Sequence, residues 1–113
     1  MNLSEFLADE KLRNAWIDEL NMKVYVRRSM RMIGDEVYKC LDIGSVEVDE
    51  DKTGKGIFTK FLARFEQEAK KIGRVIFIES ILNPRLYQYL LKNGYKTAPR
   101  SSDISPNVYK IIN

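Results

Sequence analysis

A glycine-containing loop between two apolar segments is the part of this sequence best suited to chemistry. The apolar segment ends at Val48, acidic residues follow, and Gly54-Lys55-Gly56 leads into apolar residues from Ile57 that begin a predicted helix. Glycines leave backbone N–H groups uncovered, and a helix N-terminus adds unpaired donors and partial positive charge. Strand, glycine loop and helix together predict a cradle for an anion such as a phosphate or a pyrophosphate.

The residue types that are missing limit the chemistry further. The sequence contains no histidine and one cysteine, Cys40. Catalysis by Ser-His-Asp or Cys-His is therefore excluded, and we expect no metal site. Proton transfer must then use a carboxylate, a tyrosine, a lysine, a cysteine, a terminus or water. We interpret Cys40 as a small buried strand residue, and we expect a reducing, cytoplasmic location because no intramolecular disulfide can form.

Length and composition predict one globular domain over residues 1–113. The sequence is 44% hydrophobic and 31% charged, as in soluble globular proteins. No apolar run approaches the roughly 20 residues that span a bilayer, and the first residues lack the features of a signal peptide. We therefore expect no membrane partner.

The net charge of +3 is mild, and the basic residues are spread along the chain. One cluster stands out, formed by Lys23, Arg27, Arg28 and Arg31. We interpret it as a solvated strand face, with contact to an acidic partner as the alternative, so a nucleic-acid partner is not favoured.

The elements that would position the loop begin with a predicted helix over residues 4–20. Leu12, Trp16 and Leu20 are four residues apart, Ile17 widens this stripe, and Asp9 is a candidate cap for a second helical segment. Alternating apolar residues predict a half-buried strand over residues 22–33, with Met22, Val24, Val26, Met30 and Met32 on its inner face.

A return strand is predicted over residues 36–48, joined to the first by a hairpin turn at Gly34-Asp35. Gly44 within it indicates a bulge or a close backbone approach. After the loop we predict a helix over residues 56–71, which Gly73 ends, and a buried strand over residues 75–78. These three elements predict a right-handed crossover between parallel strands.

The rest of the chain adds a helix that opens at Asn83-Pro84 and ends at Gly94. Short strands at 95–97 and 108–112 follow, separated by a polar loop. The predicted fold class is α/β, a mixed sheet that joins an antiparallel N-terminal hairpin to a parallel β-α-β crossover, with helices packing on the sheet.

This order of elements resembles the GCN5-related N-acetyltransferase (GNAT) superfamily over roughly residues 22–97. The loop from Thr53 to Phe58 lies over the family pattern Arg/Gln-x-x-Gly-x-Gly/Ala. The later segment Asn83-x-x-Leu86-x-x-Tyr89-Leu90-x-Lys92-x-Gly94-Tyr95 is similar to the family's Asn-x-x-Ala-x-x-Phe-Tyr-x-Lys-x-Gly-Phe. The two segments occur in the expected order, with the expected helix and strand between them.

The resemblance implies a transferase that uses acetyl-CoA as co-substrate and acetylates a primary amine of a small molecule or a protein lysine. Strands ending near Val48 and Glu79 would splay apart to admit the thioester, and the Asn83 side chain would contact the cofactor. Backbone groups of one strand would bind the pantetheine arm, and the loop N–H groups would hold the pyrophosphate. These two sets are Val46, Glu47 and Val48 for the arm, and Thr53, Gly54, Lys55, Gly56, Ile57 and Phe58 for the pyrophosphate.

The resemblance also implies a carboxylate base for the amine and a tyrosine that protonates the leaving thiolate. Asp42 and Glu79 are the candidate bases. Asp42 shares the strand face of Val46 if Gly44 adds no bulge, and burial would make it a better base. The alternative interpretation of Asp42 is a hydrogen-bonded structural aspartate. Leu90 occupies the usual tyrosine position, so Tyr89 is the candidate acid, and Tyr87 is a displaced alternative.

Three departures from the family pattern support a second hypothesis. Thr53 replaces Arg or Gln, Phe58 replaces a small residue, and Leu90 replaces tyrosine. The second hypothesis is an inactive GNAT-fold binding protein, and a phage-type, host-directed protein is one form of it. A third hypothesis is a nucleic-acid-binding module that uses the Lys23–Arg31 strand. Few residues precede the hairpin, so the acceptor wall is either reduced or supplied by a second subunit in a homodimer.

Overall fold

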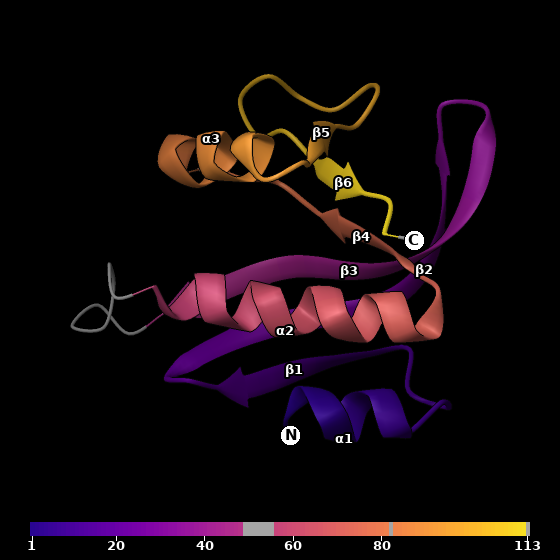
Figure 1. Cartoon of the computed structure of the whole chain (residues 1–113), viewed down its shortest axis with the longest axis vertical. Coiled ribbons are helices and arrows are strands. Elements are labelled where there is room, and N and C mark those ends of the chain that lie inside the picture. The colour runs from indigo at the N-terminus through magenta and orange to yellow at the C-terminus, as the bar shows by residue number, and fades with distance from the viewer. Residues whose placement is uncertain (49–55, 82, 113) are drawn as a thin grey trace.

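A computed structural model describes residues 1–48, 56–81 and 83–112 of the chain. These residues form a six-stranded mixed sheet in the order β1-β2-β3-β4-β6-β5, and helices pack on it (Figure 1). The elements are α1 (Leu3–Ala8), β1 (Asn14–Glu19), β2 (Met22–Ile33), β3 (Glu36–Val48), α2 (Ile57–Ile72), β4 (Val75–Ile78), α3 (Pro84–Lys92), β5 (Lys96–Thr97) and β6 (Val108–Lys110).

The prediction of a helix over residues 4–20 is wrong, because this stretch forms the short helix α1 and then the strand β1. The β1 strand pairs with β2 in antiparallel register, which places Ile17 opposite Val24 in the core. Asp9 does not cap a second helix, since its carboxylate accepts the Lys11 N–H at 3.1 Å just after α1. Helical spacing was misleading here because Ile17 is buried while its neighbour Trp16 is 46% exposed, an alternation that fits a strand.

The predicted hairpin of β2 and β3 is confirmed, including its turn at Gly34, where φ is +64°. Met30 and Met32 were expected on the buried face, but they are 67% and 71% exposed. The reason is that the tip of the hairpin projects beyond the rest of the sheet (Figure 1). Pairing of β1 with β2 stops at Arg27, and pairing of β3 with β4 begins only at Cys40.

The predicted irregularity at Gly44 is a β-bulge. Tyr25 pairs with Ser45 and Val26 pairs with Ile43, so Gly44 is an extra residue on β3. An extra residue inverts the alternation of side chains along the strand. The condition under which Asp42 would share a face with Val46 therefore fails, and the two side chains lie on opposite faces of the sheet.

The second half of the chain follows the prediction. The helix α2 ends at Gly73, which adopts a left-handed conformation with φ of +69° and donates its N–H to the helix carbonyls. The β4 strand is fully buried and runs parallel to β3. The helix α3 begins with Asn83 as its cap and Pro84 in the first turn, as the sequence indicates.

The two faces of the sheet are covered differently. A large apolar core lies between one face and the helices, and it includes Phe6 of α1, Phe65 of α2 and Leu90 of α3. The opposite face carries a smaller cluster, and no helical residue of the described chain belongs to it. Its members are Ile33, Cys40, Val75, Phe77 and Ala98. This second face is therefore the open one.

Candidate functional site

The two central parallel strands separate at one end of the sheet. The last β3–β4 pair is Ile43 with Ile78, and the Glu79 N–H still donates to the Ile43 carbonyl at 3.0 Å. The next residue, Ser80, has a positive φ of 52° and donates its N–H to the Asn107 side chain at 2.7 Å. This contact turns the chain away from β3 and toward β6, while β3 continues to Val48.

A cleft of about 380 Å³ lies where these strands separate. Its walls come from β3, from the end of β4 and the residues after it, and from the first turns of α2 and α3. The lining residues are Ile43, Gly44, Ser45, Val46, Phe58, Ile78, Glu79, Ser80, Ile81, Asn83 and Leu86. The cleft is mostly apolar, and Glu79 is the only charged residue among those that line it in the described chain.

The N-terminus of α2 lies at one wall of the cleft. Gly56 is its cap residue, with φ of +70°, and no side chain caps the helix in the described part of the chain. Phe58 is half-buried, packs against the large core and also lines the cleft. Thr53, Gly54 and Lys55 of the predicted cradle lie outside the described residues, as do the side chains of Glu47 and Val48.

The two candidate bases occupy different environments. Asp42 is fully buried on the open face of the sheet and does not line the cleft. Its carboxylate accepts hydrogen bonds from Ser29 Oγ at 2.9 Å, Arg27 Nε at 3.0 Å and the Arg31 guanidinium at 2.9 and 3.3 Å. Glu79 lines the cleft with its side chain 25% exposed, and both arginines also form ion pairs with it.

The basic cluster predicted from sequence is therefore not a solvated face. Arg27 and Arg31 are only 29% and 27% exposed because they bridge Asp42 and Glu79. Arg28 lies on the other side of the strand, where its guanidinium donates to carbonyls at the end of α1. With these three arginines in internal contacts, the β2 strand has little free positive charge for a nucleic acid.

The remaining predicted site residues divide into two groups. Asn83 lines the cleft, and its Oδ1 accepts the N–H groups of Arg85 at 2.9 Å and Leu86 at 3.3 Å. Tyr89 packs against the large core and does not line the cleft, and Leu90 is fully buried. The Tyr87 hydroxyl lies 2.6 Å from Thr97 Oγ1. The role of Tyr89 as an acid stays a prediction.

Cys40 is fully buried, as predicted. Burial, together with repulsion from the Asp42 carboxylate, raises the pKa of its thiol to about 11, so it is a poor nucleophile. In residues 1–48, 56–81 and 83–112 no group of three histidine, cysteine or acidic residues is arranged to hold a metal. Within the same ranges, no helix is long and apolar enough to cross a membrane.

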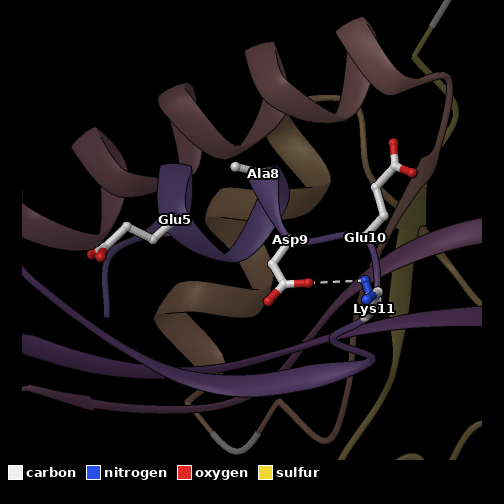
Figure 2. Close-up of a pocket in the computed structure, with 5 residues that line it drawn as sticks. All are labelled: Glu5, Ala8, Asp9, Glu10 and Lys11. Carbon is white, nitrogen blue, oxygen red and sulfur yellow. Dashed lines mark hydrogen bonds between the residues drawn. The ribbon is translucent and has the colours of Figure 1, made fainter.

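A second, larger hollow of about 620 Å³ lies against α1, away from the cleft. Figure 2 shows that Glu5 and Glu10 extend in different directions, and that the Asp9 carboxylate is bound to the backbone N–H of Lys11. The three carboxylates do not converge on one point, so this hollow offers no arrangement suited to catalysis.

Sequence reasoning missed the role of Arg27 and Arg31. A signal for it exists in the strand register, because Arg27 lies directly opposite Asp42 and Arg31 lies four residues farther along the same face. That register is set by the turn at Gly34, because the pairing runs without a shift from Ile33 opposite Glu36 to Val26 opposite Ile43.

The site and topology define a GNAT-like α/β fold, in which parallel strands separate beside a helix N-terminus. No protein-family model matches the sequence, and no curated protein matches it. Among solved structures the chain is similar to a mutant of the AtaT toxin, solved with acetyl-CoA and the C-terminus of the antitoxin AtaR, with 12% identity and a TM-score of 0.60. It is also similar to a chain of the KacTA–DNA complex, with 15% identity and a TM-score of 0.59.

These two matches cover 78% and 82% of this chain, but 56% and 59% of the chains they match. The chain therefore spans a little over half the length of each neighbour. At such low identity the likeness shows the fold alone, and that fold agrees with the one predicted from the sequence.

Proposed function

We propose that the chain is an acyl-CoA-dependent N-acetyltransferase that transfers an acetyl group to a primary amine. The observation that carries the proposal is the cleft at the end of the β3–β4 pairing, which has an apolar lining and one carboxylate, Glu79, in its wall. A binding pocket of this kind suits a long, mostly apolar arm that ends in a reactive group.

The residues of the cleft fit the arm of acetyl-CoA. Beyond Ile43, one edge of β3 no longer pairs with β4, and an unpaired strand edge offers N–H and C=O groups to an extended ligand. Val46, Ile81 and Leu86 supply apolar contacts. The AtaT structure, which has a TM-score of 0.60 to this chain, contains acetyl-CoA, and this supports the same ligand here.

The pyrophosphate would lie at the N-terminus of α2. Gly56 leaves the approach open, since no described atom lies within 4 Å of the place where a Cβ would stand. The first N–H groups of the helix can donate to an anion there. We propose that Ile57 and Phe58 contribute these backbone donors together with Thr53, Gly54 and Lys55. The Phe58 side chain packs on the core, which leaves its backbone available.

When bound, acetyl-CoA supplies the acetyl thioester. The nitrogen of the acceptor amine forms the new C–N bond, and the C–S bond breaks with its electron pair on sulfur. We assign Glu79 to take the proton that the nitrogen loses, directly or through one water, because it is the carboxylate in the cleft wall. The thiolate takes a proton from solvent or from Tyr89. Asp42 is buried among three donors and is a structural residue in this proposal.

The acceptor would reach the thioester from the open face of the sheet. No helix of the described residues covers this face. The outer wall of the acceptor site is therefore formed either by the acceptor molecule itself or by a second copy of the chain. We propose a primary amine of a small molecule or a protein lysine as the acceptor. A cytoplasmic location fits the buried, reduced Cys40.

Binding of acetyl-CoA tests the first step. A ligand present at 100 times its Kd should stabilise the chain by about 2.7 kcal/mol, which raises Tm by about 10 °C for a domain of this size. Ser45→Trp places a large ring at the cleft wall and should weaken binding more than about tenfold, or roughly 1.4 kcal/mol. The matched control is Ser102→Trp in the β5–β6 loop. No stabilisation of the wild-type chain at millimolar acetyl-CoA would refute the proposal.

Release of free CoA thiol tests the chemical step, with a lysine peptide and a polyamine as acceptors. Glu79→Gln should lower kcat by about 10²–10⁴-fold and leave the Kd for acetyl-CoA unchanged. Cys40 is fully buried, so the protein itself should contribute little thiol signal. A Glu79→Gln variant with wild-type kcat would show that this carboxylate is not the base.

A second candidate function is a GNAT-fold binding protein without catalysis. The observation that favours it is the ion pairing of Glu79, whose carboxylate is engaged by Arg27 and Arg31 rather than free. The AtaT structure holds acetyl-CoA and a piece of its antitoxin together, so both functions are compatible with one fold. A stable complex recovered by pull-down, with no thiol release for any acceptor, would favour this second function.

A further inference from the structure

Four charged side chains on the open face of the sheet form one neutral network. Arg27 and Arg31 project from β2, Asp42 from β3, and Glu79 from the end of β4. Two positive and two negative charges therefore lie together, with Asp42 fully buried at the centre. No side-chain polar atom buried in the described residues lacks a hydrogen-bond partner, so the network is complete without a ligand.

Asp42 is the anchor of this network. One of its oxygens accepts from Ser29 Oγ at 2.9 Å, and the other accepts from Arg27 Nε at 3.0 Å and Arg31 at 2.9 Å. A buried carboxylate with three donors cannot rotate without losing charge-assisted hydrogen bonds. Its position therefore fixes the two guanidinium groups.

The arginines are also held from their other sides. The Arg31 guanidinium carbon lies 4.0 Å from the centre of the Phe77 ring, and that of Arg27 lies 5.9 Å from the centre of the Tyr25 ring. Stacking on an aromatic ring and pairing with a buried carboxylate together leave each side chain little freedom. Both groups then reach Glu79 Oε1, at the point where the cleft begins.

Glu79 would be mobile without these contacts. It follows the last residue of β4, its side chain is 25% exposed, and its backbone precedes the turn at Ser80. A carboxylate in such a place normally samples several rotamers. The paired arginines restrict it to the cleft wall.

We propose that Arg27 and Arg31 are positioning residues, anchored by buried Asp42, that hold the Glu79 carboxylate at the cleft wall where it takes the proton from the acceptor amine. This inference rests on the proposed function, since it concerns the same site. The arginines contact neither the acceptor nor acetyl-CoA in this scheme, and their effect on the reaction passes entirely through Glu79.

A double-mutant cycle on the full chain tests this route. Arg31→Gln should lower kcat by about tenfold or more while the Kd for acetyl-CoA changes less than about twofold. In the Glu79→Gln background, the same Arg31→Gln change should have no further effect on kcat. Arg31→Lys should restore part of the activity, since it returns the charge. If instead the two single effects multiply in the double variant, Arg31 acts independently of Glu79 and the proposal is overturned.

Lys23→Gln is the matched control, because Lys23 is an exposed cation on the same strand and the same face. It should leave kcat unchanged. If Arg31→Gln does not fold, Arg31→Gln/Asp42→Asn removes one charge of each sign and keeps the network neutral. The charge-neutral variant should show the same loss of kcat, and wild-type kcat in it would contradict the proposal.

A measurement that needs no turnover covers the case of an inactive chain. The Glu79 side chain, labelled with ¹³C, should show a lower NMR order parameter in Arg31→Gln than in the wild type, because one of its two ion pairs is lost while Arg27 and Asp42 remain. Equal order parameters in both proteins would overturn the network's role. A wild-type chain that binds no acetyl-CoA refutes the proposed function itself, whereas multiplicative effects in an active chain refute only the positioning role.

Discussion

The β-bulge at Gly44 leaves little room for a side chain, and Gly44→Ala tests this. A Cβ added at this position would lie 3.1 Å from Tyr25 Cδ2 and 3.8 Å from Cε2. The Tyr25 ring cannot move freely, because it packs against Trp16 with 5.4 Å between ring centres. The bulge and the ring therefore compete for the same space on the open face.

The expected loss can be estimated from two opposing effects. Forcing an extra methyl group into a packed site costs about 1–3 kcal/mol. Replacing glycine by alanine restricts the unfolded chain and recovers about 0.4–1 kcal/mol. We therefore expect Gly44→Ala to lower the free energy of unfolding by about 1–2 kcal/mol, which corresponds to about 4–8 °C in Tm for a chain of this length.

Urea denaturation followed by circular dichroism measures this loss. Trp16 is the single tryptophan and lies beside Tyr25, so its fluorescence reports on the same site. Ser45→Ala, an exposed neighbour, is the control and should stay within about 0.5 kcal/mol of the wild type. Tyr25→Ser should relieve the clash, so the double variant should be more stable than the sum of the single effects. Full additivity, or a Gly44→Ala protein as stable as the wild type, would refute the packing argument.

Three further predictions concern buried groups. Tyr95→Phe removes the hydroxyl that donates to Glu66 at 2.8 Å, and a hydrogen bond to a charged group is worth about 1.5–3 kcal/mol. Because Lys110 still holds Glu66 at 3.1 Å, urea denaturation should show a free energy of unfolding lower by about 1–2 kcal/mol. An unchanged free energy of unfolding would contradict this prediction. The pKa of the buried Cys40 thiol is raised from 9.0 to about 11, so iodoacetamide should label it at pH 8 only after unfolding. Rapid labelling of the folded chain would show that the thiol is accessible and would contradict this prediction. Because the folded pKa is the higher one, the contribution of Cys40 to stability is full below about pH 9 and declines as pH rises toward 11; Cys40→Ala should lack this part of the pH dependence.

The elements that the sequence predicted well are those with strong local signals. The helix α2 has a continuous apolar face and a terminating Gly73, and α3 has Asn83 and Pro84 at its start. The buried β4 strand reads as an uninterrupted apolar run. Each of these signals acts within a few residues, so local preference and tertiary packing agree.

The first twenty residues were predicted poorly because their signals conflict. Leu12, Trp16 and Leu20 have helical spacing, but β1 buries Ile17 and leaves Trp16 exposed. The turn that returns β1 to β2 uses Leu20 and Asn21 with φ of 54° and 61°. Leucine is an unusual residue in that conformation, so no standard hairpin signal marks the turn, and pairing with β2 decides the structure.

The sequence by itself determined the helix α2, the buried strand β4 and the start of α3, because caps and apolar periodicity are local properties. It also placed Glu79 at the end of a buried strand. Only the tertiary structure decided that Asp42 and Val46 lie on opposite faces, because that depends on the bulge between β2 and β3. It also decided that Arg27 and Arg31 serve the carboxylates rather than solvent, since strand register sets the partner of each side chain and register is a non-local property.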